Sequence, residues 1–186
     1  MVGCIAFEGD RVIGSGPLAE VALDAKRVVD RVGHETVLIF DAQTSEPIEL
    51  DLRGTAADVK RRLGVGVAPV RRAPGRPKLG VVAREVTLLP RHWEWLAGQP
   101  GGASVSLRKL VEQARQVSGP RDQRRAAQES AYRFMVAMAG NHPGFEEATR
   151  ALFAGDPVRF AQLTKGWPTD VRSHVRHLAG PALADR

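Results

Sequence analysis

The most distinctive chemistry in this sequence is a run of positive charge in the middle of the chain. Between Val59 and Arg84 there are eight Lys or Arg residues and no Asp or Glu. Cationic side chains bind phosphate polymers by neutralising phosphates and releasing their condensed counterions. The run therefore makes nucleic-acid binding the first hypothesis. The alternative is a scaffold or protein-interaction module, in which a solvated basic linker connects two parts of the chain.

Two groups of residues have types that could serve in catalysis or metal binding. His174 and His177 lie three apart on a predicted helix and so share a face, but no Cys pair or His–Glu partner completes a zinc site. We therefore expect surface histidines. Four carboxylates cluster around a predicted hairpin and could suggest a metal or acid–base site: Asp41, Glu46, Glu49 and Asp51. We expect them instead to stabilise a turn and to line the solvent face of a strand. Without a nucleophile–base pair, metal cluster or phosphate-binding glycine loop, the sequence predicts no enzyme, catalytic residue, metal or cofactor.

Composition narrows the class of protein. The 186 residues allow one medium domain or two small ones, and a hydrophobic content of 43% with 26% charged residues argues against general disorder. The net charge of +6 favours phosphate polymers or anionic surfaces as partners. The single cysteine, Cys4, permits no internal disulfide and is expected to be a small core residue in a reducing compartment. No apolar run approaches the roughly 20 residues of a membrane span, and no signal-peptide pattern opens the chain, so we expect a cytoplasmic protein.

Residues 1–65 are predicted to form a small α+β domain with the order β-β-α-β-β-α. Its predicted elements are the strands Cys4–Phe7 and Arg11–Gly14, a helix from Leu18 to Gly33, the strands Thr36–Phe40 and Ile48–Leu52, and a short helix capped by Thr55. Helical spacing of apolar residues supports the first helix. Strict alternation in residues 48–52 implies that one face of that strand is wet.

Residues 66–80 are predicted to be an extended linker, because three prolines stiffen it and its positive charges repel one another. Its segment Gly75-Arg76-Pro77 resembles the centre of an AT-hook, a motif that lays Arg-Gly-Arg-Pro into the A·T-rich minor groove. Pro74 stands where that motif has its first arginine. A narrow minor groove attracts arginine through its negative potential, so Arg76 is a candidate for that contact. A plain solvated linker is the alternative.

Residues 81–117 are predicted to fold as strand–helix–helix. The predicted strand is Val81–Leu88, and Pro90 opens the first helix, whose apolar face carries Trp93, Leu96 and Ala97. Ser104 is the predicted N-cap of the second helix, and helix starts bind phosphate readily. The core stripe of that helix is predicted at Leu107, Leu110, Val111, Ala114 and Val117.

This order resembles the ribbon-helix-helix class of DNA-binding proteins, in which a strand from each subunit pairs with its twin and the ribbon enters the major groove. If Val86 and Leu88 face the core, Glu85 and Thr87 point outward. Glu85 would repel phosphate and Leu89 is a poor N-cap, so the match is imperfect. The other interpretation is an ordinary strand and helical hairpin inside one domain.

Residues 120–186 are predicted to be wholly helical and to continue the region that starts at residue 81. One helix ends at Gly140, a second at Gly155, and a third begins after the N-cap Asp156. The last is expected to begin at Thr169 or Asp170 and to break at Gly180-Pro181. A second basic cluster either lengthens the phosphate-contacting surface or is solvated helix charge: Arg121, Arg124 and Arg125.

The segment Arg76–Leu96 is similar to the central block of a bacterial family catalogued only as domain of unknown function family 2239. Ala131–Met135 and Pro143–Ala148 resemble later segments of that family, so the resemblance spans nearly the whole chain. It implies a bacterial, soluble protein. The family brings no activity and no catalytic residue, so the functional hypothesis rests on the residues themselves.

The sequence thus predicts an α+β protein that binds DNA as a homodimer, without a membrane partner, and acts as a transcriptional regulator. The dimer is expected to form through residues 81–117, with the flanking parts left to bind an effector or partner. The residues expected to contact phosphate are Arg71, Arg72, Arg76, Lys78, Arg84 and Arg91, with Ser104 at a helix start. Thr87 is the best candidate for a base edge, since phosphate contacts position a protein without reading sequence.

Overall fold

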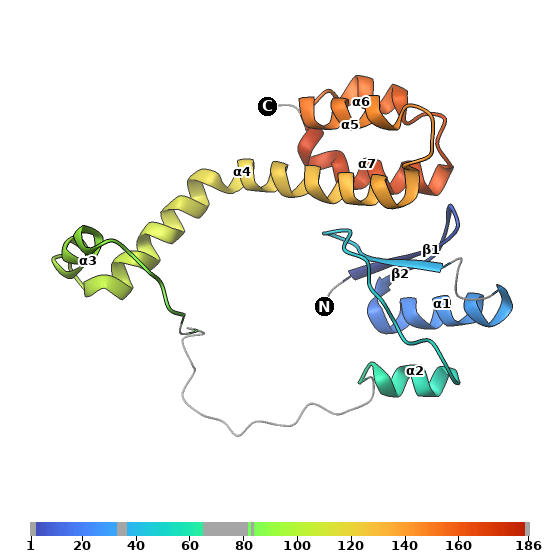
Figure 1. Ribbon diagram of the computed structural model, residues 1–186, viewed down its shortest axis with the longest axis horizontal. Coiled ribbons are helices and arrows are strands. Elements are labelled where there is room, and N and C mark those ends of the chain that lie inside the picture. Colours follow the sequence, from blue (N-terminus) through green and yellow to red (C-terminus); the bar gives the residue numbers. More distant parts are fainter. Residues whose placement is uncertain (1–2, 33–36, 65–81, 83, 185–186) are drawn as a thin grey trace. The chain divides into compact units, whose positions relative to one another are not determined.

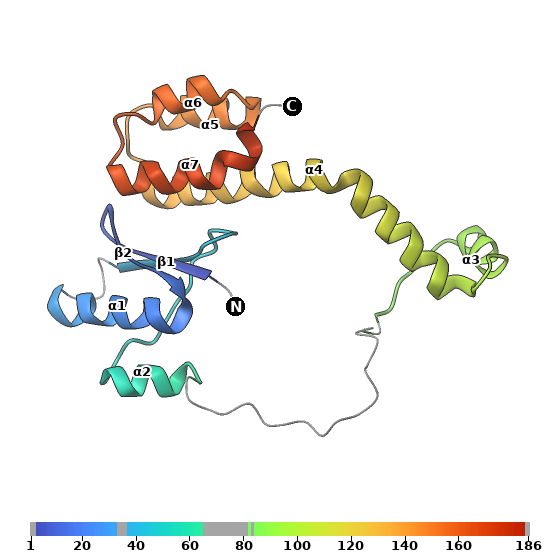
Figure 2. The ribbon, with the colours of Figure 1, turned by 180° about the vertical axis from the view of Figure 1, so that it is seen from behind.

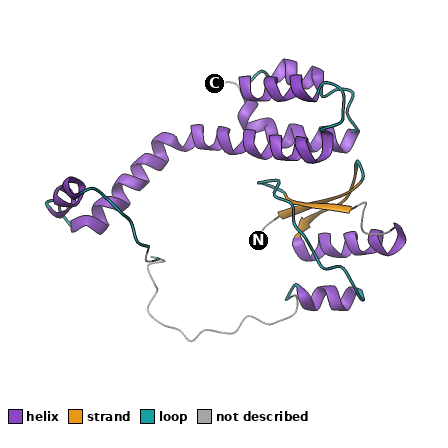
Figure 3. Ribbon diagram, viewed as in Figure 1, coloured by secondary structure: helices purple, strands orange, loops and turns teal. Residues whose placement is uncertain are grey.

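The computed structural model describes residues 3–32, 37–64, 82 and 84–184. The chain divides into two compact units, one made of residues 1–67 and 121–186 and the other of residues 68–120. Three strands and seven helices lie within the described ranges, which confirms the α+β class (Figures 1 and 3). This grouping differs from the predicted boundaries, which placed residues 1–65 and 81–186 in separate domains.

The first unit is built on a three-stranded antiparallel sheet. Its strands are β1 (Gly3–Glu8), β2 (Arg11–Pro17) and β3 (Val37–Asp41), in the spatial order β2-β1-β3. The predicted hairpin of β1 and β2 is confirmed, and Gly9 takes the positive φ of 55° that its tight turn requires. Asp170 of the C-terminal part of the chain binds the edge strand β2, because its carboxylate accepts a hydrogen bond of 2.9 Å from the Val12 amide.

Side chains alternate across this sheet and supply two separate cores. Cys4 and Ala6 of β1 belong to one core, whereas Ile5 and Phe7 belong to the other. On β3, Ile39 faces the first core and Phe40 the second. Successive strand residues point to opposite faces, so both faces of this small sheet are covered.

The face that carries Cys4 is covered by α1 (Leu18–Val32), while α2 (Ala56–Arg62) packs against α1 and adds Val59 to the same core (Figures 1 and 2). The buried side of α1 presents Val21, Ala22, Ala25 and Val29 to the sheet. Thr55 caps α2 as predicted: its side chain accepts from the Asp58 amide, while the Asp58 carboxylate accepts from the Thr55 amide. Cys4 is buried here, as expected of a small core residue.

The opposite face is covered by helices from the C-terminal part of the chain. They are the C-terminal part of α4 (Gly102–Ala139), α5 (Phe145–Ala154), α6 (Pro157–Leu163) and α7 (Thr169–Leu183). Phe134 lies at the centre of this core, with its ring centroid 5.3 Å from that of Phe7 and 5.6 Å from that of Phe40. The predicted cap Asp156 is confirmed, since its side chain accepts from the Arg159 amide at 2.9 Å.

The predicted strand Ile48–Leu52 does not form. The chain makes an isolated bridge between Phe40 and Pro47, and the Ile48 amide donates to the Ile39 carbonyl at 2.8 Å. Pro47 has no amide hydrogen to extend the ladder. The alternation itself was correct, because Ile48, Leu50 and Leu52 join the core beneath α1 although the segment is not a strand.

The predicted helix break at Gly180-Pro181 is wrong. Pro181 lies inside α7, which continues to Leu183, and Pro120 lies inside α4. A proline in a helix removes one backbone hydrogen bond and crowds the preceding turn. In α7 the burial of Leu178, Ala179 and Ala182 on either side of Pro181 offsets that cost.

Candidate nucleic-acid interface

Four of the six cations predicted to contact phosphate lie outside the described part of the chain. These are Arg71, Arg72, Arg76 and Lys78, together with the AT-hook-like segment at residues 75–77. Just before them, the last turn of α2 carries Lys60, Arg61 and Arg62, all exposed. Arg61 pairs with Asp58 at 2.7 Å and Arg62 lies 3.6 Å from Asp51, so carboxylates already neutralise part of this charge.

The predicted strand Val81–Leu88 lies within the described residues at 82 and 84–88, and these residues have no regular secondary structure in the single chain. They pair with no strand among the described residues, and the sheet of the first unit does not include them. Leu89 has an extended backbone, with φ −66° and ψ 149°. Arg84, Glu85, Val86 and Thr87 are exposed and Leu88 is half-buried. The expected strand is therefore absent here, because a β-ladder needs a second strand to accept and donate its hydrogen bonds.

A helical hairpin follows, with α3 (Pro90–Ala97) leading into the start of α4. Pro90 stands at the first helical position, as predicted. Leu89 makes no side-chain cap, although its carbonyl accepts from the His92 amide at 2.8 Å. Gly101 and Gly102 turn the chain with φ of 86° and 73°. Arg91 projects from the first turn of α3 with its side chain exposed.

The sequence predicted Ser104 as the N-cap of the second helix, and this prediction is wrong. The helix begins two residues earlier at Gly102, so Ser104 lies inside its first turn with an exposed side chain. Its carbonyl accepts a 3.1 Å hydrogen bond from the Arg108 guanidinium. Gly101 and Gly102 adopt positive φ and complete the turn before residue 104, so the helix starts earlier than predicted.

The apolar residues of this unit are mostly exposed. Among its described residues, Leu96 and Ser106 are buried. The predicted core stripe of the second helix is wrong for the single chain, since Leu107 is half-buried while Leu110, Val111, Ala114 and Val117 are exposed. Trp93, expected on the apolar face of α3, is 42% exposed, and its neighbour Trp95 is 53% exposed. No role was predicted for Trp95 from the sequence. Because residues two positions apart on a helix point in different directions, Trp93 and Trp95 cannot both lie on the apolar face of α3.

Charge in the described part of this unit is moderately positive. Residues 84–120 contain five Lys or Arg residues and three Glu residues, an excess of two positive charges. Arg115 lies 3.4 Å from Glu112 within one helical face. Arg84 and Arg91 make no salt bridge with any described residue, and both are accessible to a polyanion. Most of the positive charge predicted for an interface therefore comes from the segment before residue 84.

The residues with catalytic or metal-binding types serve structural roles in the first unit. The Asp41 carboxylate accepts the amides of Gln43 and Thr44, each at 2.8 Å, which confirms turn chemistry and lowers the pKa of Asp41. Asp51 pairs with Arg53 at 2.8 Å. Among the described residues, no three His, Cys, Asp or Glu side chains gather as a metal site would require. No helix in the described ranges is long and apolar enough to cross a membrane.

The expectation of two surface histidines is wrong for His174. His177 is exposed, but His174 is 9% exposed and lies between Phe7, Phe134 and His177. Its Nε2 atom has no hydrogen-bond partner among the described residues. Burial, and then the charge of His177, lower the pKa of His174 to about 4. The helix turns enough between the two residues for one to face the core and the other solvent.

The second basic cluster lies on α4 within the first unit. Arg125 lies 3.4 Å from Asp122 and 3.8 Å from Glu129, as solvated helix charges do. The Arg124 guanidinium packs over the backbone of Gly155, where a Cβ atom would leave it no room. Arg124 therefore helps to join α4 to the end of α5.

Comparison with known proteins identifies a family but no characterised relative. Neither the curated proteins nor the solved structures gave a match to this chain. A family model described as "Uncharacterized protein conserved in bacteria (DUF2239)" matches residues 3–179, which covers both units. The chain therefore belongs to this uncharacterised bacterial family, in agreement with the resemblance of its central block.

Proposed function

We propose that this protein binds duplex DNA as a homodimer and acts as a transcriptional regulator through residues 84–117 and the basic segment before them. The observation that carries the proposal is the segment 84–88, which has no regular secondary structure, pairs with no described strand and leads through Leu89 into a helical hairpin. Among the described residues, the backbone of residues 84–88 makes no hydrogen bond, and several apolar side chains near it are exposed.

Pairing with a second copy would satisfy both needs. An unpaired extended segment presents amides and carbonyls that a second strand can bond. Val86 and Leu89 of this segment are 53% and 49% exposed, and several apolar side chains of the hairpin are exposed as well. Accessible apolar surface of this kind marks interaction sites. Antiparallel pairing of two identical segments gives a closed two-fold dimer, which is the commonest symmetry of oligomers.

The basic residues determine which ligand a dimer would favour. Six cations of the chain are proposed to contact phosphate: Arg71, Arg72, Arg76, Lys78, Arg84 and Arg91. If Val86 and Leu88 turn toward the dimer core, the exposed Thr87 and Glu85 project from the opposite face of the ribbon. Thr87 is then the candidate for a base contact, since a ribbon of two strands fits the major groove.

Salt dependence tests the DNA-binding part of the proposal. Six phosphate contacts predict a log–log slope of affinity against salt of about −5, measured by fluorescence anisotropy with a labelled duplex. The double variant Arg84→Ala/Arg91→Ala should make the slope shallower by about 2. The control is Arg159→Ala, an exposed arginine of the first unit outside the proposed interface. An affinity that salt does not change, or no binding to any duplex, would contradict DNA binding.

The dimer has its own test. Val86→Lys should shift the chain toward monomer in sedimentation equilibrium, because it places two like charges across the proposed ribbon. Val158→Lys is the matched control, since Val158 is 66% exposed on α6 in the first unit. If both variants and the wild type are monomers, the ribbon is wrong. A Val86-dependent dimer that ignores DNA would instead identify a protein-interaction module with a basic linker.

A further inference from the structure

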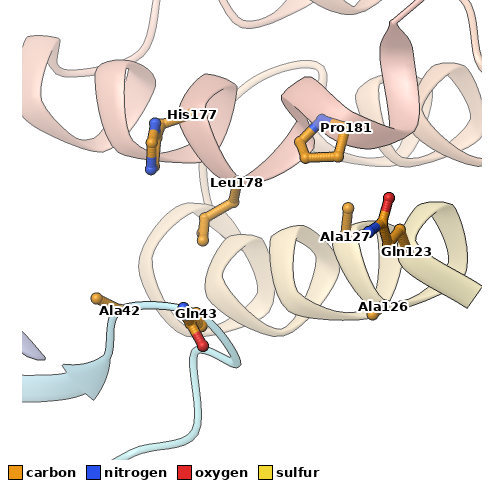
Figure 4. Close-up of a pocket in the computed structure, with 8 residues that line it drawn as sticks. All are labelled: Ala42, Gln43, Gln123, Ala126, Ala127, His177, Leu178 and Pro181. Carbon is orange, nitrogen blue, oxygen red and sulfur yellow. The ribbon is translucent and has the colours of Figure 1, made fainter. Parts of the chain in front are cut away.

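A cleft of about 500 Å³ lies in the first unit, between the turn after β3, the helix α4 and the helix α7 (Figure 4). Its lining residues are Ala42, Gln43, Gln123, Ala126, Ala127, His177, Leu178 and Pro181. Small-molecule sites commonly have this size, with mostly apolar walls and a few polar groups. Figure 4 shows that the lining comes from three elements distant in sequence, so no local motif could have revealed it.

Three polar side chains line this cleft, one from each element. Gln43 comes from the turn, Gln123 from α4 and His177 from α7. All three are exposed, and none of their side-chain atoms is hydrogen-bonded to another described residue. Carboxamides both donate and accept, and an imidazole can do the same. These groups are therefore available to a ligand, while Ala126, Leu178 and Pro181 offer apolar contact.

The turn that carries Gln43 is held rigidly. The carboxylate of Asp41 accepts the Gln43 and Thr44 amides, and the Asp41 carbonyl accepts the Ser45 amide at 3.0 Å. At its base, the Ala42 amide donates to Gly3 at 2.8 Å. A wall fixed before binding loses little conformational entropy when a ligand arrives.

Ser45 adds strain to this turn. It has φ of 55°, a left-handed conformation that costs a non-glycine residue about 1 kcal/mol or more. It is fully buried, and its hydroxyl lies 3.0 Å from the hydroxyl of Ser130 on α4. The Arg133 guanidinium of the same helix donates to the Thr44 carbonyl. Strained residues fixed by their surroundings concentrate at ligand sites, and here the hydrogen bonds with Ser130 and Arg133 hold the strained turn against α4.

The charge of the lining defines the ligand. None of the eight residues drawn in Figure 4 carries a carboxylate, ammonium or guanidinium group. A charged ligand would lose hydration there without gaining a counter-charge. We infer that this cleft binds a small uncharged ligand that combines apolar surface with hydrogen-bond donors and acceptors, as a nucleobase or an aromatic carboxamide does. This inference stands apart from the DNA-binding proposal and survives if that proposal fails.

Nuclear magnetic resonance on the full-length, ¹⁵N-labelled chain tests the site with three probes: uracil, adenine and nicotinamide. At least one probe should shift the side-chain amide signals of Gln43 and Gln123 and the ring signals of His177. For ligands of this size we expect dissociation constants from about 0.1 mM to millimolar. Gln123→Leu removes one polar group from an exposed helical position and should weaken the binding about tenfold.

A cleft-filling substitution supplies the second arm. Ala126→Phe places a ring in the cleft from an exposed helical position and should abolish the shifts. Ala137→Phe is the matched control, because Ala137 is exposed on the same helix and does not line the cleft. The inference is overturned if no probe moves the three groups, or if Ala126→Phe and Ala137→Phe respond alike. If Ala126→Phe fails to fold, unchanged binding by Gln123→Leu overturns it instead.

Discussion

At the scale of single residues, His174 is the least expected feature of the first unit. A titratable ring lies in an aromatic core, 4.6 Å from Phe134 and 5.9 Å from Phe7 between ring centroids, and leaves Nε2 without a partner among the described residues. The core therefore favours the neutral imidazole, and the pKa of His174 falls to about 4. The ring of His177 stacks on that of His174, and its charge lowers the pKa of His174 further.

His174 should make the protein less stable in acid. The unfolded chain binds a proton at this histidine near pH 6.5, whereas the folded chain resists protonation until about pH 4. Unfolding therefore takes up a proton between these values, and the free energy of unfolding falls as the pH falls. Between pH 7 and pH 5 the wild type should lose about 2 kcal/mol more than His174→Phe, measured by urea denaturation. His92→Phe, at an exposed position of the second unit, is the control and should keep the wild-type pH dependence. Equal losses in the wild type and His174→Phe would contradict this.

The candidate interface was predictable residue by residue only in part. Arg84, Thr87 and Arg91 are exposed, as a binding role requires. Ser104 was predicted to cap the second helix, but Gly101 and Gly102 turn the chain at positive φ and the helix starts before Ser104. The cleft was not predictable, because Gln43, Gln123 and His177 are distant in sequence and glutamines on solvent faces carry no signal by themselves.

At the scale of elements, the sequence predicted what local chemistry determines. The turn around Gly9, the capping box of Thr55 and the N-cap Asp156 are all confirmed, because each depends on a few adjacent residues. The failures involve distant partners. Residues 48–52 alternate as a strand does, but whether a ladder forms depends on the neighbouring strand. Likewise Pro181 ends no helix, because the core beneath α7 compensates for the lost hydrogen bond.

Pro120 offers a test at this scale, since it lies inside α4 without an amide to bond to the preceding turn. An interior proline costs a helix about 3 kcal/mol relative to alanine. Pro120→Ala should therefore slow hydrogen exchange of the amides around residue 120 by tenfold or more. Pro90→Ala is the contrast, because a proline at the first helical position forfeits no helical hydrogen bond. Unchanged or faster exchange in Pro120→Ala would show that α4 is not one continuous helix at this point.

At the scale of the whole molecule, the first unit draws its core from the two ends of the chain. Phe7 and Phe40 meet Phe134 across a long stretch of intervening sequence, and Val175 and Leu178 of α7 complete the same core. Apolar stripes in a sequence reveal that a face is buried but not which other face covers it. For this reason the sequence grouped the C-terminal helices with residues 81–117, whereas the structure groups them with residues 1–67.

This shared core predicts that two separate fragments will assemble. Residues 1–67 and 121–186 contain the whole first unit, so the two pieces should co-purify when expressed together, and the sheet should then be covered on both faces. Phe134→Ala in the second fragment removes the ring that contacts both Phe7 and Phe40, at a cost of about 3–5 kcal/mol. The affinity between fragments, measured by calorimetry, should fall by about 100-fold or more. Val136→Ala, two positions along the same helix and 51% exposed, should change it little. If the fragments do not associate, residues 68–120 are required to hold the first unit together. If both substitutions weaken the association equally, Phe134 is not the contact that joins the fragments.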